Sequence, residues 1–219
     1  MNASHRPGLL ASLTLCLASA LGAMPASARE MATREWNFDV SLDGRPIGHH
    51  RFTLREQDES RDLSSEARFN VRFLFINAYR YEHRAQERWQ GDCLQSVAAR
   101  TDANGEPLVV EGERGNAGFR LRSGSEVVLQ DPCVQTFAYW NPSILDAQRL
   151  LNPQTGEYVD VKILPMGREL LGGQQTDRYR LLGSGRTPLQ IDLWYTAARD
   201  WVALESLTPE GRRLQYVRK

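Results

Sequence analysis

Residues 36–54 read WNFDVSLDGRPIGHHRFTL, and this stretch predicts two antiparallel strands joined by a tight turn. Its first half alternates polar with apolar side chains, the apolar ones being Trp36, Phe38, Val40 and Leu42. Such alternation is typical of a strand with one buried face and one face in water. Residues 43–46 supply the turn, and Phe52 and Leu54 continue the apolar face on the returning strand.

The same period of two recurs along the rest of the chain. Residues 79–89 place one set of side chains on a single face of a strand, namely Tyr79, Tyr81, His83, Ala85, Glu87 and Trp89. Asn104-Gly105 is a strong hairpin signal. About a dozen such strands follow one another at regular spacing, and their short connections favour antiparallel pairing.

One segment carries helix signals instead. Asn141 suits a helix cap and Pro142 the first helical position, and Asn152-Pro153 would end the helix. We therefore expect a mainly β fold, in which one large curved antiparallel sheet, a half-barrel, clasps one or two helices. Residues 29–219 are expected to form this single domain.

Residues 1–28 have the pattern of a secretory signal peptide. Arg6 precedes an apolar run over residues 9–23, and Ala26-Ser27-Ala28 matches the small-x-small pattern that a signal peptidase accepts. The run is shorter than the roughly 20 residues that a membrane span needs. We expect cleavage after Ala28 and a product in the periplasm, or secreted, that does not span the membrane.

The composition excludes several classes of protein. The chain has 219 residues, of which 41% are hydrophobic and 25% charged, as in a soluble globular protein. Its 27 basic and 27 acidic residues cancel, so it lacks the basic surface that nucleic acid requires. We expect a monomer that does not bind nucleic acid.

Cys93 and Cys133 remain after the predicted cleavage. Exported proteins meet oxidants, so we expect a structural disulfide between these two residues. It would close a loop of about 40 residues and contribute up to roughly 4 kcal/mol in the chain-entropy model. A reactive thiol pair is the alternative, although no C-x-x-C spacing supports it.

The candidate ligand-binding residues lie on the face of residues 79–89 and before the predicted helix. If that face is the interior, His83 and Glu87 are buried ionisable groups that need partners, and such groups often mark functional sites. Aromatic side chains with a polar tip suit the mouth of a cavity. The expected set is Tyr79, Tyr81, His83, Glu87, Trp89, Tyr139 and Trp140. Ordinary core packing, with each polar group satisfied by a neighbour, is the alternative for every member.

A metal site is not expected. His49 and His50 are adjacent, and neighbours on a regular strand point to opposite faces. The pair therefore cannot hold one ion together, and one ring is expected to face inward and the other outward.

Four motifs carry a resemblance to a known family. They are W-x-F-x-V-x-L-D-G-x-x-I-G-x-H at residues 36–50, E-x-W-x-x-x-C-L at 87–94, Y-W-N-P-x-I-L at 139–145, and L-W-Y with W-V-x-L-E over 193–205. Together they resemble an uncharacterised family of exported bacterial proteins of unknown function. The chain is also distantly similar to periplasmic half-barrel families of the lipoprotein-carrier kind. That similarity implies a concave sheet around a helix and brings no catalytic residue with it.

Catalytic and cofactor signatures are missing from the sequence, including G-x-S-x-G, H-E-x-x-H, the P-loop and the dinucleotide fingerprint. No catalytic residue and no cofactor are therefore assigned. The favoured hypothesis is an exported binding or carrier protein for a lipid-like, apolar or amphipathic ligand, with a role in envelope maintenance. The alternatives are a module that docks another envelope protein, or a hydrolase on a glycan or lipid that uses His83 and Glu87 as acid and base.

Overall fold

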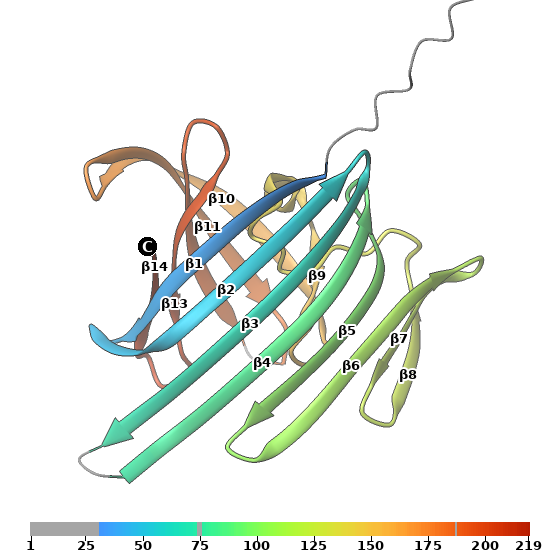
Figure 1. The fold of residues 1–219 in the computed structure, drawn as a ribbon, viewed down its shortest axis with the longest axis horizontal. Helices are drawn as coiled ribbons and strands as arrows, with labels where there is room; N and C mark the ends of the chain where they lie inside the picture. Colours follow the sequence, from blue (N-terminus) through green and yellow to red (C-terminus); the bar gives the residue numbers. More distant parts are fainter. Residues whose placement is uncertain (1–30, 74–75, 187) are drawn as a thin grey trace, which may run out of the picture.

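The computed structural model describes residues 31–73, 76–186 and 188–219, and the signal peptide predicted at residues 1–28 lies outside them. The described residues form one sheet of fourteen strands (Figure 1). The first eight strands are β1 (Ala32–Leu42), β2 (Arg45–Gln57), β3 (Ser60–Phe73), β4 (Ile76–Gln90), β5 (Cys93–Ala103), β6 (Glu106–Gly115), β7 (Gly118–Ser123) and β8 (Glu126–Gln130). The others are β9 (Arg149–Leu151), β10 (Tyr158–Leu171), β11 (Gln174–Ser184), β12 (Leu189–Tyr195), β13 (Trp201–Leu207) and β14 (Arg213–Arg218).

The strand order is β8-β7-β6-β5-β4-β3-β2-β1-β14-β13-β12-β11-β10-β9, with antiparallel neighbours throughout. The chain thus forms two meanders. The first runs from the centre of the sheet to the β8 edge, and the second runs from the β9 edge back to the centre. β1 and β14 join the two meanders, while β8 and β9 remain the two edges, so the sheet is not closed into a barrel.

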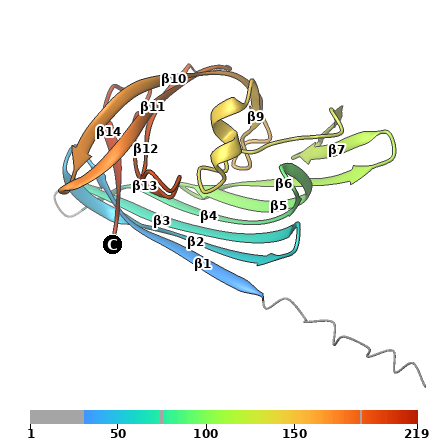
Figure 2. The ribbon, with the colours of Figure 1, turned by 90° about the horizontal axis from the view of Figure 1, so that it is seen from above.

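The sheet curves strongly, so that β10–β12 stand opposite β3–β6 in Figure 2, with β1 and β14 side by side at the bend. The alternating apolar residues of β1 face the enclosed side, and Trp36, Phe38 and Val40 are all buried there. Two hairpin turns have the predicted chemistry. Asp43-Gly44 (φ 50° and 75°) and Asn104-Gly105 (φ 56° and 87°) place two successive residues in the left-handed region, which matches the twist of the flanking strands.

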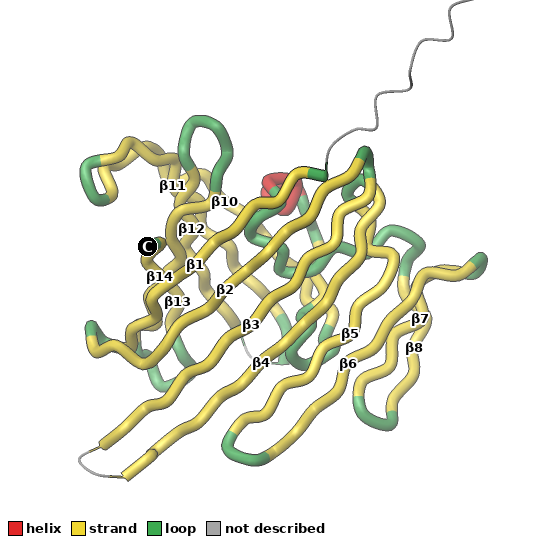
Figure 3. The backbone as a smooth tube through the Cα atoms, viewed as in Figure 1, coloured by secondary structure: helices red, strands yellow, loops and turns green. Residues whose placement is uncertain are grey.

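The helix predicted after Asn141 is wrong beyond its first turn. The structure has only a 3₁₀ turn, η1 (Pro142–Asp146), and no α-helix among the residues it describes, as Figure 3 shows. Asn141 does cap this turn, because its Oδ1 accepts a hydrogen bond from the backbone N–H of Ser143 at 3.2 Å. The sheet therefore clasps no α-helix within the described ranges.

Pairing with other strands explains why the helix does not continue. Arg149–Leu151 forms β9 and pairs with β10, and the N–H of Leu151 donates to the carbonyl of Gln135 at 2.8 Å. Backbone groups that would form hydrogen bonds within a helix therefore form them with neighbouring segments.

No helix in the described ranges is long and apolar enough to span a bilayer.

Residues 131–148 connect the two edges of the sheet and fill part of the enclosed side (Figure 2). The predicted disulfide between Cys93 and Cys133 is present, with the two Cα atoms 4.8 Å apart. Next to it, the N–H of Leu94 donates to the carbonyl of Val134 at 2.9 Å. The connection is thus attached to the start of β5, and Trp140 and Ile144 are buried beyond it.

Candidate functional site

Small side chains occupy the concave face where β3, β4 and β5 lie side by side. Ser65, Ala85 and Ala99 form one cross-strand row, and Ala67 stands next to His83 in the adjacent row. All five side chains are buried. A row of alanine and serine fills much less volume than the aromatic residues on β1, so space remains between this part of the sheet and the opposite wall.

That space is a cavity of about 500 Å³. Such a volume lies within the ~300–1000 Å³ of typical small-molecule sites. Strands β2–β4 form one wall, with His50, Phe52, Leu63, Ser65, His83, Ala85 and Glu87. The opposite wall, from β12–β14, is mostly apolar and includes Leu189, Ile191, Trp201, Leu204, Leu214 and Tyr216. Residues 137–140, 152–154 and 206–209 complete the lining.

His50 is held by two neighbours at one part of the cavity wall. Its Nε2 lies 2.8 Å from Ser65 Oγ, and its Nδ1 lies 3.4 Å from the hydroxyl of Tyr216. Burial lowers the pKa of His50 well below the ordinary value of 6.5, and the neighbouring His83 and His49 lower it further. The ring is therefore neutral at physiological pH.

His83 has one hydrogen-bond partner, and the geometry fixes its tautomer. Its Nδ1 lies 3.0 Å from Thr101 Oγ1, and the same hydroxyl donates to the carbonyl oxygen of Gln154 at 3.2 Å. A hydroxyl has one proton, so Thr101 must accept from His83, and Nδ1 carries the hydrogen. Burial lowers the pKa of His83 to about 4. The neutral ring thus keeps Nε2 as a bare acceptor.

Glu87 is a buried carboxyl group without a cationic partner among the described residues. Trp89 Nε1 donates to its Oε2 at 2.9 Å, and the hydroxyl of Thr136 donates to the same oxygen at 3.2 Å. Burial raises the pKa of Glu87 to about 7, although these two hydrogen bonds oppose the rise. Around neutral pH a large fraction of the protein therefore carries a protonated Glu87.

Comparison with known proteins places the chain in a family. A family profile described as "Domain of unknown function (DUF6134)" matches residues 38–219. The chain belongs to the DUF6134 family. No match was found among proteins with curated descriptions.

A solved structure has a similar fold. It is described as "Crystal Structure of Beta-barrel-like Protein of Domain of Unknown Function DUF1849 from Brucella abortus". The TM-score is 0.65 at 7% identity, over 88% of this chain and 98% of the other. At this identity the likeness concerns the fold alone. The predicted resemblance to an uncharacterised family is thereby supported, whereas the similarity to lipoprotein carriers stays a prediction.

Four of the seven predicted ligand-binding residues line the cavity of the DUF6134 protein. They are His83, Glu87, Tyr139 and Trp140. Tyr139 and Trp140 belong to the connection between the two sheet edges. The hydroxyl of Tyr195 on β12 donates a hydrogen bond to the backbone carbonyl oxygen of Tyr139 at 2.8 Å and so attaches this connection to the opposite wall. The structure thus brings together residues that lie more than fifty positions apart in the sequence.

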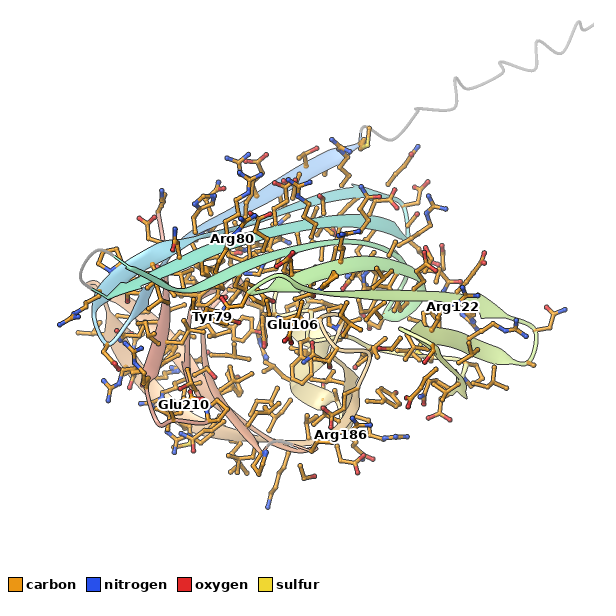
Figure 4. All side chains as sticks on the ribbon, turned by 90° about the horizontal axis from the view of Figure 1, so that it is seen from below. Tyr79, Arg80, Glu106, Arg122, Arg186 and Glu210 are labelled. Atoms are coloured by element: carbon orange, nitrogen blue, oxygen red, sulfur yellow. A yellow bond between two sulfur atoms is a disulfide. The ribbon has the colours of Figure 1, made fainter. Side chains whose placement is uncertain are left out.

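The other three predicted residues lie beside the cavity rather than on its wall. The hydroxyl of Tyr81 donates to Gln154 Oε1 at 2.6 Å, and Gln154 does line the cavity. Trp89 is fully buried behind Glu87 and packs edge-on against Trp140, with ring centroids 5.7 Å apart. Tyr79 is 38% exposed, and Figure 4 shows it and Arg80 leaving β4 on opposite sides.

Sequence reasoning missed several polar members of the cavity, chiefly His50, Ser65, Gln154 and Tyr216. The alternation of β2 contained the signal for His50, because the residue shares a face with Phe52 and Leu54. The structure bears this out, since His50 is buried and His49 exposed. Tyr216 carried no comparable signal, because only the pairing of β14 with β1 brings it near His50.

The arrangement limits the chemistry of the cavity. His83 and Glu87 are four residues apart on one strand, or about 13 Å. Their hydrogen bonds go to different partners, so they do not form an acid–base pair on one atom. Within the described ranges no three His, Cys, Asp or Glu side chains gather as metal ligands. The cavity offers separate hydrogen-bonding groups on largely apolar walls, namely two neutral histidines and one carboxyl group that is partly protonated near pH 7.

Proposed function

We propose that this protein is an exported, periplasmic binding or carrier protein that holds a lipid-like ligand in its cavity and serves envelope maintenance. The observation that carries the proposal is the cavity of about 500 Å³ between a wall of small side chains and an apolar wall. An apolar ligand gains roughly 25 cal/mol for each Å² of surface removed from water. The few polar groups in the lining would orient the polar end of such a ligand.

The signal-peptide pattern of residues 1–28 supports export, and a disulfide between Cys93 and Cys133 suits an oxidising compartment. A hydrolase is less well supported, because the two candidate catalytic residues lie too far apart to act together. The cavity favours a ligand carrier over a module that only docks another protein.

Native mass spectrometry of protein purified from a bacterial periplasm tests the proposal. We expect a bound mass of several hundred daltons that leaves on denaturation. The variant Ala85→Leu projects a larger side chain into the cavity and should reduce this bound fraction at least fivefold. Ala98→Leu is the matched control, because Ala98 is exposed on the neighbouring strand β5. A clean apo mass, with no uptake of membrane lipid extract by the delipidated protein, would contradict the proposal.

One observation favours the second candidate function, docking of an envelope protein. The edge strand β8 exposes Val127, Val128 and Leu129, by 54%, 43% and 60%. Exposed apolar edge strands readily pair with a further strand. Under this alternative, Val128→Lys should abolish an in-cell crosslink to a partner and leave the bound ligand mass unchanged. A crosslinking pattern unaffected by Val128→Lys would remove the docking function.

A further inference from the structure

The cavity wall has a composition that restricts the head group of its ligand. Its described lining contains one carboxyl group and two histidines, but no arginine or lysine. A carboxylate or phosphate head group placed there would lose its hydration without meeting a cation, which is strongly unfavourable. Glu87 would add repulsion whenever it is ionised.

His83 supplies a hydrogen-bond acceptor. The hydrogen on Nδ1 is used by Thr101, and Thr101 in turn donates to the carbonyl of Gln154. Nε2 therefore has a lone pair, and it has no hydrogen-bond partner among the described residues. Since His83 is 97% buried and lines the cavity, a ligand that donates an O–H or N–H is the partner that this nitrogen can take.

Glu87 supplies the complementary donor. Both of its hydrogen bonds arrive at Oε2, one from Trp89 and one from Thr136. An oxygen that accepts two hydrogens has no room for one of its own, so in the neutral acid the proton resides on Oε1. Oε1 has no partner among the described residues, and Glu87 lies on the cavity wall. The neutral acid can thus donate to a ligand oxygen.

From this pair of groups we infer that the ligand is an uncharged amphiphile, such as a long-chain alcohol, whose hydroxyl group donates to His83 Nε2. The inference rests on the proposed function and specifies its ligand class. The apolar β12–β14 wall would cover the hydrocarbon part. A carbonyl or ether oxygen farther along the ligand would suit Glu87, about 13 Å away along β4.

A series of ligands with one tail and different head groups tests the inference. Delipidated full-length mature protein is titrated with dodecan-1-ol, dodecanoate, dodecyl phosphate and dodecane, with the tryptophan emission as readout because Trp140 and Trp201 line the cavity. Native mass spectrometry confirms the stoichiometry. We expect dodecan-1-ol to bind at least tenfold more tightly than either anion, and about tenfold more tightly than dodecane.

Two variants of His83 test whether its side chain binds the head group of the ligand. His83→Leu should lower the affinity for dodecan-1-ol about tenfold, to that of dodecane, and should leave the affinity for dodecane unchanged. His83→Gln, whose side chain has a carbonyl acceptor, should restore part of the loss. His49→Leu is the matched control, because His49 is exposed on the other face of β2. Near-UV circular dichroism checks the fold of each variant.

The outcomes separate the two proposals. If all four compounds bind equally, or dodecanoate binds most tightly, the inference about the head group is overturned and the carrier function stands. If none of them binds and no membrane lipid is taken up, both proposals fall. Should His83→Leu fail to fold, the ranking of the alcohol against the two anions on the unaltered protein still decides the question.

Discussion

Two buried acids, Asp192 and Glu87, behave in opposite ways. They are 3% and 5% exposed, so both side chains are largely shielded from water. Asp192 lies on the outer face of β12, where Arg180 holds it in a two-pronged pair with N–O distances of 2.7 and 2.8 Å and Arg178 adds a further hydrogen bond. Despite desolvation, these hydrogen bonds and charges lower the pKa of Asp192.

Glu87 meets only neutral donors, and its pKa is raised to about 7 because desolvation exceeds the effect of those hydrogen bonds. The partners of these two buried acids thus decide their charge. The outer face of this sheet keeps its charges by pairing them, whereas the cavity wall stays close to neutral. That neutrality is what makes the cavity compatible with an uncharged ligand.

Removal of the charge at position 192 should have the largest effect. Asp192→Ala takes its acid from Arg180 and leaves Arg178 only with Glu169, 3.5 Å away, and breaking a buried ion pair in this way costs about 3 kcal/mol. This figure is at the low end because both guanidinium groups remain about a quarter exposed. Urea denaturation at pH 7 measures it. A loss below 1 kcal/mol would show that water replaces the carboxylate and that the pairing is not structural.

Glu87→Gln should act in the opposite direction. The folded pKa of about 7 exceeds the ordinary 4.5, so between these values the folded protein holds a proton that the unfolded chain has released. Stability is therefore lost as the pH rises from 4.5 to 7, and the loss is complete above 7. The glutamine variant avoids it and should be about 2 kcal/mol more stable at pH 8.

Denaturant titration from pH 4 to 9 checks this expectation, with Glu66→Gln as the control because Glu66 is exposed on β3. Equal pH profiles for the unaltered protein and the Glu87→Gln variant would mean that Glu87 has an ordinary pKa. In that case the contrast with Asp192 disappears.

His83 gives a smaller effect of opposite slope. Its folded pKa of about 4 is below the ordinary 6.5, so the unfolded chain binds a proton that the folded protein does not. Stability is lost as the pH falls from 6.5 to 4, which offsets the contribution of Glu87 across most of the same range. His83→Gln should be about 1–2 kcal/mol more stable than the unaltered protein at pH 5. His50 carries a shift of the same direction and stays in place in this variant.

The same denaturant series at pH 5 and pH 8 measures the His83 effect, and His49→Gln serves as its surface control. The gain should be confined to pH 5. A gain of equal size at pH 8 would indicate better packing instead of a protonation effect.

Removal of an exposed ion pair should have the smallest effect on stability. Arg88 and Asp62 lie 3.2 Å apart with side chains 65% and 57% exposed. Surface pairs of this kind contribute little, so Arg88→Ala should change stability by less than about 0.5 kcal/mol. Thermal unfolding at low and high salt measures it. A change comparable to that of Asp192→Ala would contradict the view that desolvation makes the buried pairing of Asp192 important.

Local sequence patterns predicted much of this fold. The alternation around Trp36 and the turn at Asn104-Gly105 depend on short-range signals, and the disulfide between Cys93 and Cys133 follows from the one cysteine pairing that the predicted cleavage leaves. The helix predicted after Asn141 extends too far, because Leu151 shares a helical face with Ile144 and Leu145 and only its distant partner Tyr158 on β10 draws it into a strand.

The candidate site was predictable on one side only. The alternation of β4 placed His83 and Glu87 on the inner face, but the cavity also requires Ser65 and Ala85 to be adjacent and the β12–β14 wall to stand opposite. No local sequence pattern indicates that the β12–β14 wall lies across the cavity from β4. The sequence also did not predict the contrast between Asp192 and Glu87, since that contrast depends on the pairing of β11 with β12, which brings Arg180 next to Asp192.

The pairing of β1 with β14 has a consequence for the order of folding. Every other pairing in the sheet joins strands that follow one another along the chain, whereas Phe38 pairs with Arg218. Each meander can thus assemble from nearby hairpins, but the two cannot enclose a common interior until β14 has reached β1. Contacts of such long sequence separation form slowly because loop closure must come first. Under the export that we propose, β14 is the last of the described strands to cross the membrane, and the apolar face of β1 stays unpaired along that edge until β14 arrives.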